Sequence, residues 1–253
     1  MICIWCKEDF EKLSLEHGIP EGLACPPELE LHDVACVGCN NALSRVDRAL
    51  VKQFEMLTVL YGVRRKKGRA PTINSWTAVR SSHRADGPHL MINGGPGVVD
   101  ADGRPLHPAS KANGITNVWM APETRQMGFT QQFGNDPRFL PALYKVGLNL
   151  VAKHFGAAKA AGEKYDHVRA FVRTEAGAPV LTAAMDGEAL HAPVTEASII
   201  AKHGRAYPMF RVAILGVTFL LDMAPDQPGL RDLQGAATLH GEPLYVFPTA
   251  LAA

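Results

Sequence analysis

The sequence predicts an α+β protein in two parts: a small N-terminal unit braced by paired cysteines, and a larger mixed α+β domain. Two observations support this prediction. Four of the 5 cysteines stand in two close pairs near the N-terminus, and a stretch with helical periodicity follows the second pair. Beyond residue 72, short strand-like segments alternate with Gly and Pro turns and with helical stretches.

The paired cysteines have the spacing of a metal site. Cys3 and Cys6 form one C-x2-C pair, and Cys36 and Cys39 form another. Two such pairs can complete a tetrahedral site of four thiolates, which suits zinc and leaves no open coordination position. We therefore expect a structural Zn²⁺, since bound zinc contributes about 10–16 kcal/mol of apparent folding free energy in small zinc domains.

A helix is predicted directly after the second cysteine pair. Over residues 40–62, apolar side chains recur every three to four positions, and Gly62 is suited to end the helix. Residues 19–35, between the pairs, hold too many prolines and glycines for a long helix and predict loops with short strands. Residues 1–62 thus form the first predicted domain, and residues 63–71 form a basic linker.

Residues 72–253 predict a second domain of α+β type. Two helices are expected, one over residues 136–162 with Asp136 as its N-cap, and one over residues 165–174. A hairpin turn is expected at Asp102-Gly103. The strand-like segments are residues 75–82, 89–94, 97–106, 116–121, 209–224 and 243–249. No catalytic motif stands out in this domain, which leaves open a substrate-binding or regulatory role.

Charge is nearly balanced overall, with a formal net charge of +1, so composition alone identifies no nucleic-acid partner. Along the chain it is uneven: acids dominate up to Asp33, and bases dominate from Arg45 to Arg69. Such a basic segment can follow a phosphate backbone or remain a solvated linker. The candidate contacts to nucleic acid are Arg45, Arg64, Arg65, Lys66 and Lys67.

The sequence contains no secretory leader and no apolar run of membrane-spanning length. We therefore expect a cytoplasmic protein without a membrane partner. Nothing in the sequence fixes the oligomeric state, and a homodimer stays open.

The segment "SLEHGIP" between the cysteine pairs carries chemistry that a closed zinc site leaves unexplained. It contains Glu16 and His17, while Asn40 directly follows Cys39, so that the rigid cysteine turn can aim Asn40 back toward this segment. Carboxylate and carboxamide oxygens are ligands that Mg²⁺ prefers. An adjacent imidazole can deprotonate a water molecule for attack on phosphorus.

Together these residues resemble the four-cysteine, zinc-containing branch of the HNH, or ββα-metal (His-Me finger), endonucleases. The matching elements are C-x2-C, then [DE]-H-x-x-P at residues 16–20, then C-x2-C-N at residues 36–40 followed by a helix. The resemblance implies a zinc-braced ββα-metal finger in which His17 is the general base and Glu16 and Asn40 hold a catalytic Mg²⁺ or Mn²⁺. It implies an endonuclease that hydrolyses phosphodiester bonds of nucleic acid, with DNA favoured.

Two positions depart from the family pattern. Glu16 stands where Asp is more usual, and no asparagine shortly before the second cysteine pair is placed to orient His17. His32, Asp33 or a backbone carbonyl could fix the tautomer of His17 instead, and the following asparagine could replace Asn40 as a ligand. Two other functions stay open: a zinc module that binds nucleic acid without cutting it, and a structural or signalling protein scaffolded by zinc.

Overall fold

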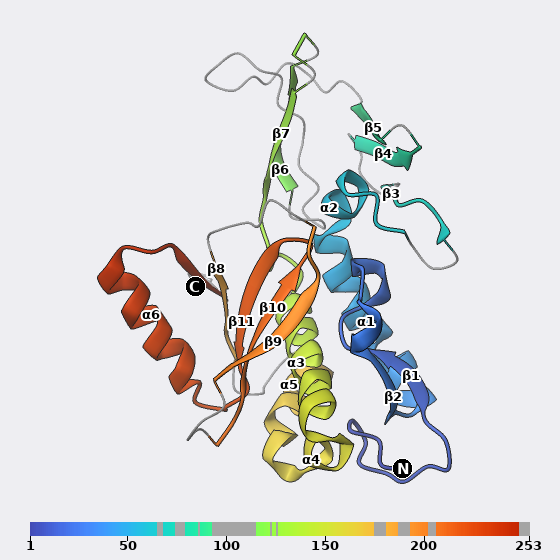
Figure 1. Cartoon of the computed structure of the whole chain (residues 1–253), viewed down its shortest axis with the longest axis vertical. Helices are drawn as coiled ribbons and strands as arrows, with labels where there is room; N and C mark the ends of the chain where they lie inside the picture. The colour runs from blue at the N-terminus through green and yellow to red at the C-terminus, as the bar shows by residue number, and fades with distance from the viewer. Residues whose placement is uncertain are drawn as a thin grey trace. The chain divides into compact units, whose positions relative to one another are not determined.

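The structure is a computed structural model (Figure 1), which describes residues 1–64, 68–73, 79–85, 87–92, 115–121, 123–124, 126–174, 181–186, 193–201 and 206–247. The chain divides into two compact units: residues 1–50 with residues 137–253, and residues 51–136. The first unit therefore joins the cysteine-bearing segment to the C-terminal part of the chain. The division into domains 1–62 and 72–253 with a linker between them stays a prediction.

The N-terminal segment forms a hairpin followed by a helix. Strand β1 (Ser14–His17) pairs antiparallel with β2 (Glu30–Ala35). Two short 3-10 turns, η1 (Glu21–Leu23) and η2 (Pro27–Leu29), occupy the connection, as expected for a segment whose prolines exclude a long helix. Helix α1 (Val37–Gln53) begins almost directly after β2.

The helix predicted over residues 40–62 is two helices. α1 begins at Val37, so Cys39 and Asn40 lie in its first turn instead of preceding the helix. The chain leaves helical geometry at Phe54 (φ −106°, ψ 7°), and α2 (Glu55–Leu60) follows. Gly62, with a φ of 65°, lies just beyond the end of α2, as its predicted role requires.

The second unit contains two small antiparallel sheets. The first has the order β3-β4-β5, and the second pairs β6 with β7. The strands are β3 (Thr72–Ile73), β4 (Val79–Arg84), β5 (Gly87–Ile92), β6 (Ile115–Ala121) and β7 (Gln126–Gln131). They overlap the strand predictions at residues 75–82, 89–94 and 116–121. The prediction for residues 97–106, including Asp102-Gly103, lies outside the described residues.

The C-terminal part of the first unit consists of helices and one antiparallel sheet with the strand order β12-β8-β11-β10-β9. Its strands are β8 (Ala183–Asp186), β9 (Glu196–Ala201), β10 (Met209–Ile214), β11 (Val217–Asp222) and β12 (Leu244–Phe247). Its helical elements are α3 (Phe139–Phe155), α4 (Ala157–Ala161), η5 (Glu163–Tyr165), α5 (Asp166–Thr174) and α6 (Pro228–His240). The α+β class is confirmed.

The helix predicted over residues 136–162 differs from the observed one at both ends. Asp136 is not the N-cap: α3 begins at Phe139, and its first hydrogen bond runs from Ala142 N to Arg138 O. Gly156, with φ 90° and ψ 153°, leaves helical geometry and separates α3 from α4. The two helices replace the single long one because only glycine adopts this conformation easily.

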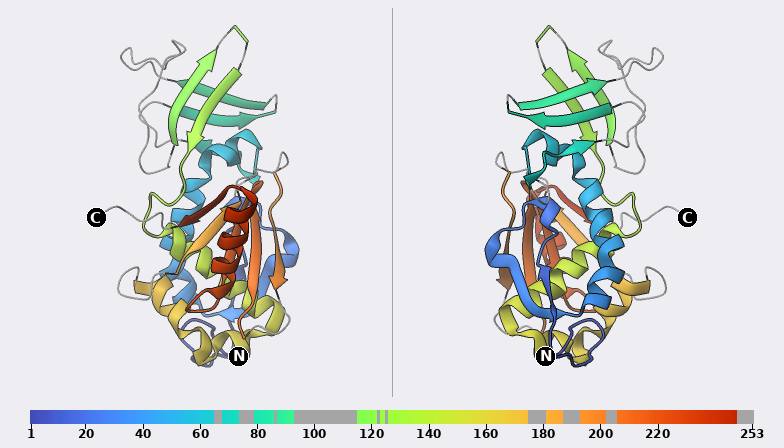
Figure 2. Two further views of the ribbon diagram at one scale, coloured as in Figure 1. Left: turned by 90° about the vertical axis from the view of Figure 1, so that its left-hand side faces the viewer. Right: turned by 90° about the vertical axis from the view of Figure 1, so that its right-hand side faces the viewer.

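Helix α3 is buried along most of its length because it is covered on two sides (Figure 2). On the sheet side, the ring of Phe139 lies 5.7 Å from that of Phe219 and 5.8 Å from that of Phe247. On the other side, α3 contacts the β1–β2 hairpin, where Lys145 reaches Glu16. The helix therefore forms the middle layer between the hairpin and the sheet.

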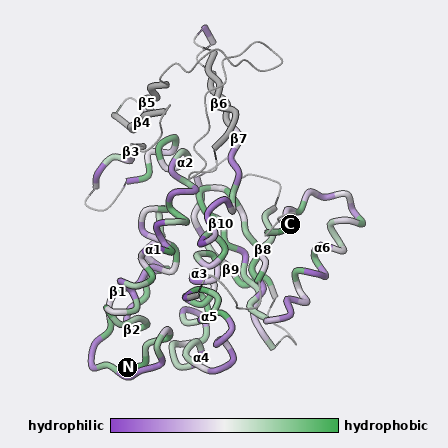
Figure 3. Tube along the Cα trace, turned by 180° about the vertical axis from the view of Figure 1, so that it is seen from behind, coloured by the Kyte–Doolittle hydropathy of each residue, from purple (hydrophilic) through white to green (hydrophobic). Residues whose placement is uncertain are grey.

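Helix α6 covers the opposite face of the sheet. Leu230 packs with Ala184 and Met209 in a small buried cluster. Hydrophilic and hydrophobic stretches alternate along this helix (Figure 3), as expected for an element with one face toward a sheet. The sheet is thus enclosed by α3 on one face and α6 on the other.

Arg169 on α5 ties the N-terminal loop to the helices. Its buried guanidinium donates hydrogen bonds to the carbonyl oxygens of Ile4 (3.2 Å), Ala160 (2.7 Å) and Gly162 (2.5 Å). It also pairs with the carboxylate of Asp166 at 2.6 Å. Because Ile4 lies between Cys3 and Cys6, these bonds hold the first cysteine pair in place.

We predict that Arg169→Met lowers the free energy of unfolding by about 2–4 kcal/mol, because buried carbonyl oxygens would lose their donor. Urea unfolding of the purified protein measures this. Arg231→Met is the control, since Arg231 makes an exposed, 3.8 Å ion pair with Asp226 that contributes little. Equal stability of the two variants would contradict the role given to Arg169.

Candidate functional site

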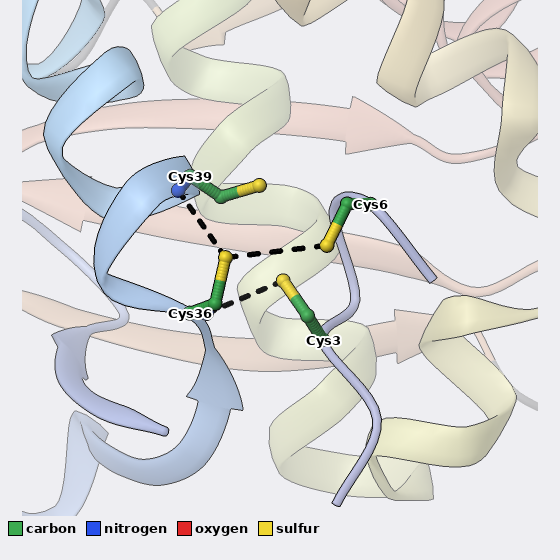
Figure 4. A group of neighbouring side chains, drawn as sticks. All are labelled: Cys3, Cys6, Cys36 and Cys39. Atoms are coloured by element: carbon green, nitrogen blue, oxygen red, sulfur yellow. Dashed lines mark hydrogen bonds between the residues drawn. The ribbon is translucent and has the colours of Figure 1, made fainter. Parts of the chain in front are cut away.

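The four paired cysteines come together at the start of α1, as the sequence predicts (Figure 4). Their sulfur atoms all lie within 4.8 Å of one another. The Sγ atoms of Cys6 and Cys36 are 4.0 Å apart, close to the spacing of about 3.8 Å that tetrahedral Zn–S bonds of about 2.3 Å require. In the described part of the chain, this is the one group of three or more His, Cys, Asp or Glu ligand atoms that meet.

Two backbone N–H groups donate hydrogen bonds to sulfur atoms of this cluster, which favours the thiolate form of those sulfurs. Cys36 N donates to Cys3 Sγ, and Cys39 N donates to Cys36 Sγ, each at 3.3 Å. Burial raises the pKa of Cys3, but hydrogen bonds from the backbone N–H groups of Cys36, Cys6 and Trp5 lower it overall. Burial raises the pKa of Cys39, and the neighbouring sulfurs raise it further. Four adjacent thiolates therefore need a cation between them, and zinc is the cation that fits this donor set.

Arg173 adds positive charge beside the cluster. Its guanidinium donates to Cys39 Sγ at 3.6 Å, and its carbonyl accepts a 3.4 Å hydrogen bond from Arg45. Arg45 and Arg173 also line a shallow pocket of about 220 Å³ next to Cys39. Of the other basic candidates, Arg64 donates to the carbonyl of Gly68 at 3.4 Å. Arg65, Lys66 and Lys67 lie outside the described residues, and contact of these bases with nucleic acid stays a prediction.

The hairpin and α1 bring Asn40 beside the strand that carries Glu16 and His17. The amide nitrogen of Asn40 donates to Ser14 Oγ at 3.2 Å and to the carbonyl of Leu15 at 3.1 Å. His17 lies at the end of β1 and is partly exposed. The three residues singled out from the sequence are thus carried by neighbouring parts of one ββα unit.

Glu16 points away from solvent into a buried polar cluster. Its Oε1 atom accepts hydrogen bonds from Lys145 Nζ at 2.5 Å and from Asn149 Nδ2 at 3.3 Å. Asp47 on α1 contacts the same ammonium group at 2.9 Å. Asn149 also donates to the carbonyl oxygen of His17 at 3.1 Å. We call Glu16, Asp47, Lys145 and Asn149 the Lys145 cluster.

The electrostatics of the Lys145 cluster keep the lysine charged. Burial alone would lower the pKa of Lys145, but the carboxylates of Asp47 and Glu16 raise it overall. Burial raises the pKa of Asp47, while Lys145 and the nearby His17 oppose that shift. His32 and Asp33, considered above as partners for His17, are exposed on β2.

The sequence analysis missed Asp47, Lys145 and Asn149. Lys145 and Asn149 are polar residues one turn apart in the mostly apolar first three turns of the helix, so they share a face. This pattern could have indicated a buried polar cluster, because a charged side chain inside an apolar helix needs a partner of opposite charge. The partner itself lies on β1, far away in sequence, and local periodicity does not identify it.

Comparison with protein-family models, with curated proteins and with solved structures finds no match to this chain. Within the described ranges, no helix is long and apolar enough to cross a membrane. The feature that the structure shows directly is the four-cysteine cluster, which is a candidate structural zinc site.

We predict that purified protein carries about one zinc ion per chain, and that Cys36→Ser lowers zinc content and folded fraction together, because metal binding and folding are coupled. Elemental analysis and circular dichroism measure the two quantities. Cys25→Ser is the control, since Cys25 lies outside the cluster. A well-folded wild-type protein free of zinc would rule out the zinc site.

Proposed function

We propose that this protein is a metal-dependent endonuclease in which His17 activates water for attack on a phosphodiester bond, with DNA the favoured substrate. One observation carries the proposal: a four-cysteine cluster braces a ββα unit, and the same unit carries a partly exposed imidazole, His17, together with Glu16 and Asn40. The resemblance to four-cysteine HNH endonucleases gives these positions their proposed roles.

The surroundings of His17 suit a general base. The ring is partly exposed, so water can reach it, whereas Glu16 beside it is buried. The carbonyl of His17 is fixed by Asn149, which holds the backbone at the end of β1. A water-accessible imidazole held in this way can serve as the general base toward water.

The residues near His17 fit a divalent metal in donor type. Glu16 supplies a carboxylate, and the amide nitrogen of Asn40 is taken by β1, which leaves its oxygen as the atom to face a metal. These are hard oxygen donors of the kind that hold Mg²⁺ or Mn²⁺. When bound, such an ion would neutralise the scissile phosphate and stabilise the leaving oxygen.

A second candidate function is a zinc module that binds nucleic acid without cutting it. The observation that favours it is the 2.5 Å contact between Glu16 and Lys145, because an ammonium group there already neutralises the carboxylate proposed as a metal ligand. In this case the ββα unit and its basic residues would serve binding alone.

The test of cleavage is incubation of plasmid and single-stranded DNA with wild-type protein and with His17→Ala, with and without Mg²⁺ or Mn²⁺. We predict that His17→Ala lowers the cleavage rate about 10²–10⁴-fold, the usual contribution of a general base, with little change in melting temperature. His32→Ala, which alters an exposed histidine of β2, is the control and should cut like wild type.

Two outcomes of this assay would count against the nuclease. Unchanged cleavage by His17→Ala would remove His17 as the base, and a sharp fall in its melting temperature would make it structural. Binding of DNA by a wild-type protein that never cuts would favour the second function.

A further prediction concerns the basic run Arg64 to Lys67. If these side chains track the phosphate backbone, replacing all four by alanine should weaken binding to every DNA sequence alike. It should also reduce the slope of log K against log salt by up to about 0.9 per lost phosphate contact. Fluorescence anisotropy at several salt concentrations measures the slope. An unchanged slope would make the run a solvated linker.

A further inference from the structure

The Lys145 cluster holds more negative charge than its own cation balances. Glu16 and Asp47 contribute two carboxylates, and Lys145 contributes one ammonium group in contact with both. The side chains of Lys145 and Glu16 are only 2% and 3% exposed. At this depth Glu16 and Lys145 balance each other, so the extra carboxyl group is that of Asp47, whose side chain is 25% exposed.

Two buried oxygen atoms in the same cluster also lack a donor. Within the described residues, neither Glu16 Oε2 nor Asn149 Oδ1 has a hydrogen-bond partner, and Asn149 is only 1% exposed. These atoms belong to side chains already joined by the 3.3 Å contact between Asn149 Nδ2 and Glu16 Oε1. Buried acceptors in proteins nearly always face a donor or an ion, so this pair calls for one.

We propose that Glu16, Asp47 and Asn149 form a binding site for a divalent cation, and that the ammonium group of Lys145 is an internal cation that competes for it. The donors are two carboxylates and a carboxamide, the oxygen-only set that Mg²⁺ and Mn²⁺ favour. A divalent cation in place of the ammonium group would bring the charge of the two carboxylates to zero.

The arrangement of the helices supports such a competition. Lys145 and Asn149 lie one turn apart on α3 and reach the same carboxylate of β1. One face of α3 therefore carries both the competing ammonium group and the carboxamide of Asn149, a proposed ligand. Asp47 is 25% exposed, so an ion can approach from its side, whereas Glu16 and Asn149 are almost fully buried.

This inference shares one ligand, Glu16, with the proposed nuclease and rests on that function only to this extent. The remaining ligands differ: they are Asp47 on α1 and Asn149 on α3, in place of Asn40. It also explains how Glu16 can be both a metal ligand and a partner of Lys145, since the two cations would occupy the carboxylate in turn.

The test is Mn²⁺ binding to the full-length, zinc-loaded protein, followed by electron paramagnetic resonance of free Mn²⁺. Lys145→Met removes the competing charge at nearly constant size and should lower the Kd for Mn²⁺ by about tenfold or more. Lys145→Arg keeps the charge and should bind like wild type. Equal Mn²⁺ affinity in Lys145→Met and wild type would overturn the proposal.

Second substitutions in the Lys145→Met background assign the ligands. Asp47→Asn and Asn149→Leu should each reverse the gain in affinity, while Glu30→Gln, which changes an exposed acid of β2, should leave it. A gain in affinity that survives Asp47→Asn and Asn149→Leu would overturn this inference and leave the proposed nuclease site intact. Conversely, the expected Mn²⁺ binding in a protein that never cuts DNA would sustain the inference and count against the nuclease.

Removal of the ammonium group leaves two carboxylates close together, so Lys145→Met can lose stability. Measurement of the melting temperature keeps the proposal testable in that case. If the site exists, millimolar Mn²⁺ should raise the melting temperature of Lys145→Met by more than that of wild type. An equal rise, or none, would overturn the proposal.

Discussion

The meeting of four cysteine sulfurs at the start of α1 is the constraint on which the N-terminal architecture depends. The hairpin has only two short strands, and such an element is marginal without further support. A metal bound by Cys3, Cys6, Cys36 and Cys39 would cross-link the N-terminal loop, the end of β2 and the first turn of α1. The positions of His17 and Asn40 on the ββα unit follow from that cross-link.

A second constraint joins this unit to the rest of its compact body. Lys145 on α3 reaches Glu16 on β1, and Arg169 on α5 reaches the carbonyl of Ile4. A buried ion pair such as Lys145–Glu16 is weak evidence for stability, because removing both charges from water offsets much of their attraction. The proposed competition between Lys145 and a metal ion would give this pair a role beside His17.

Local patterns in the sequence predicted the cysteine cluster, the α+β class and the helical regions of α1 to α5, but not helix α6, which lies where only strands were expected. These features depend on spacing within a few residues, which sequence displays directly. The N-cap at Asp136 was wrong, because helix boundaries depend on backbone geometry beyond the pattern of apolar residues. The Lys145 cluster was missed because Glu16 and Lys145 belong to distant segments, and their contact depends on how α3 packs against the hairpin.

The central claim, that four thiolates hold one zinc ion and thereby brace the ββα unit, is tested most directly by zinc K-edge X-ray absorption on the purified full-length protein. The account predicts a first shell of four sulfur atoms at about 2.3 Å from zinc, with no nitrogen or oxygen ligand. A shell with fewer sulfurs, or one completed by nitrogen or oxygen, would contradict it.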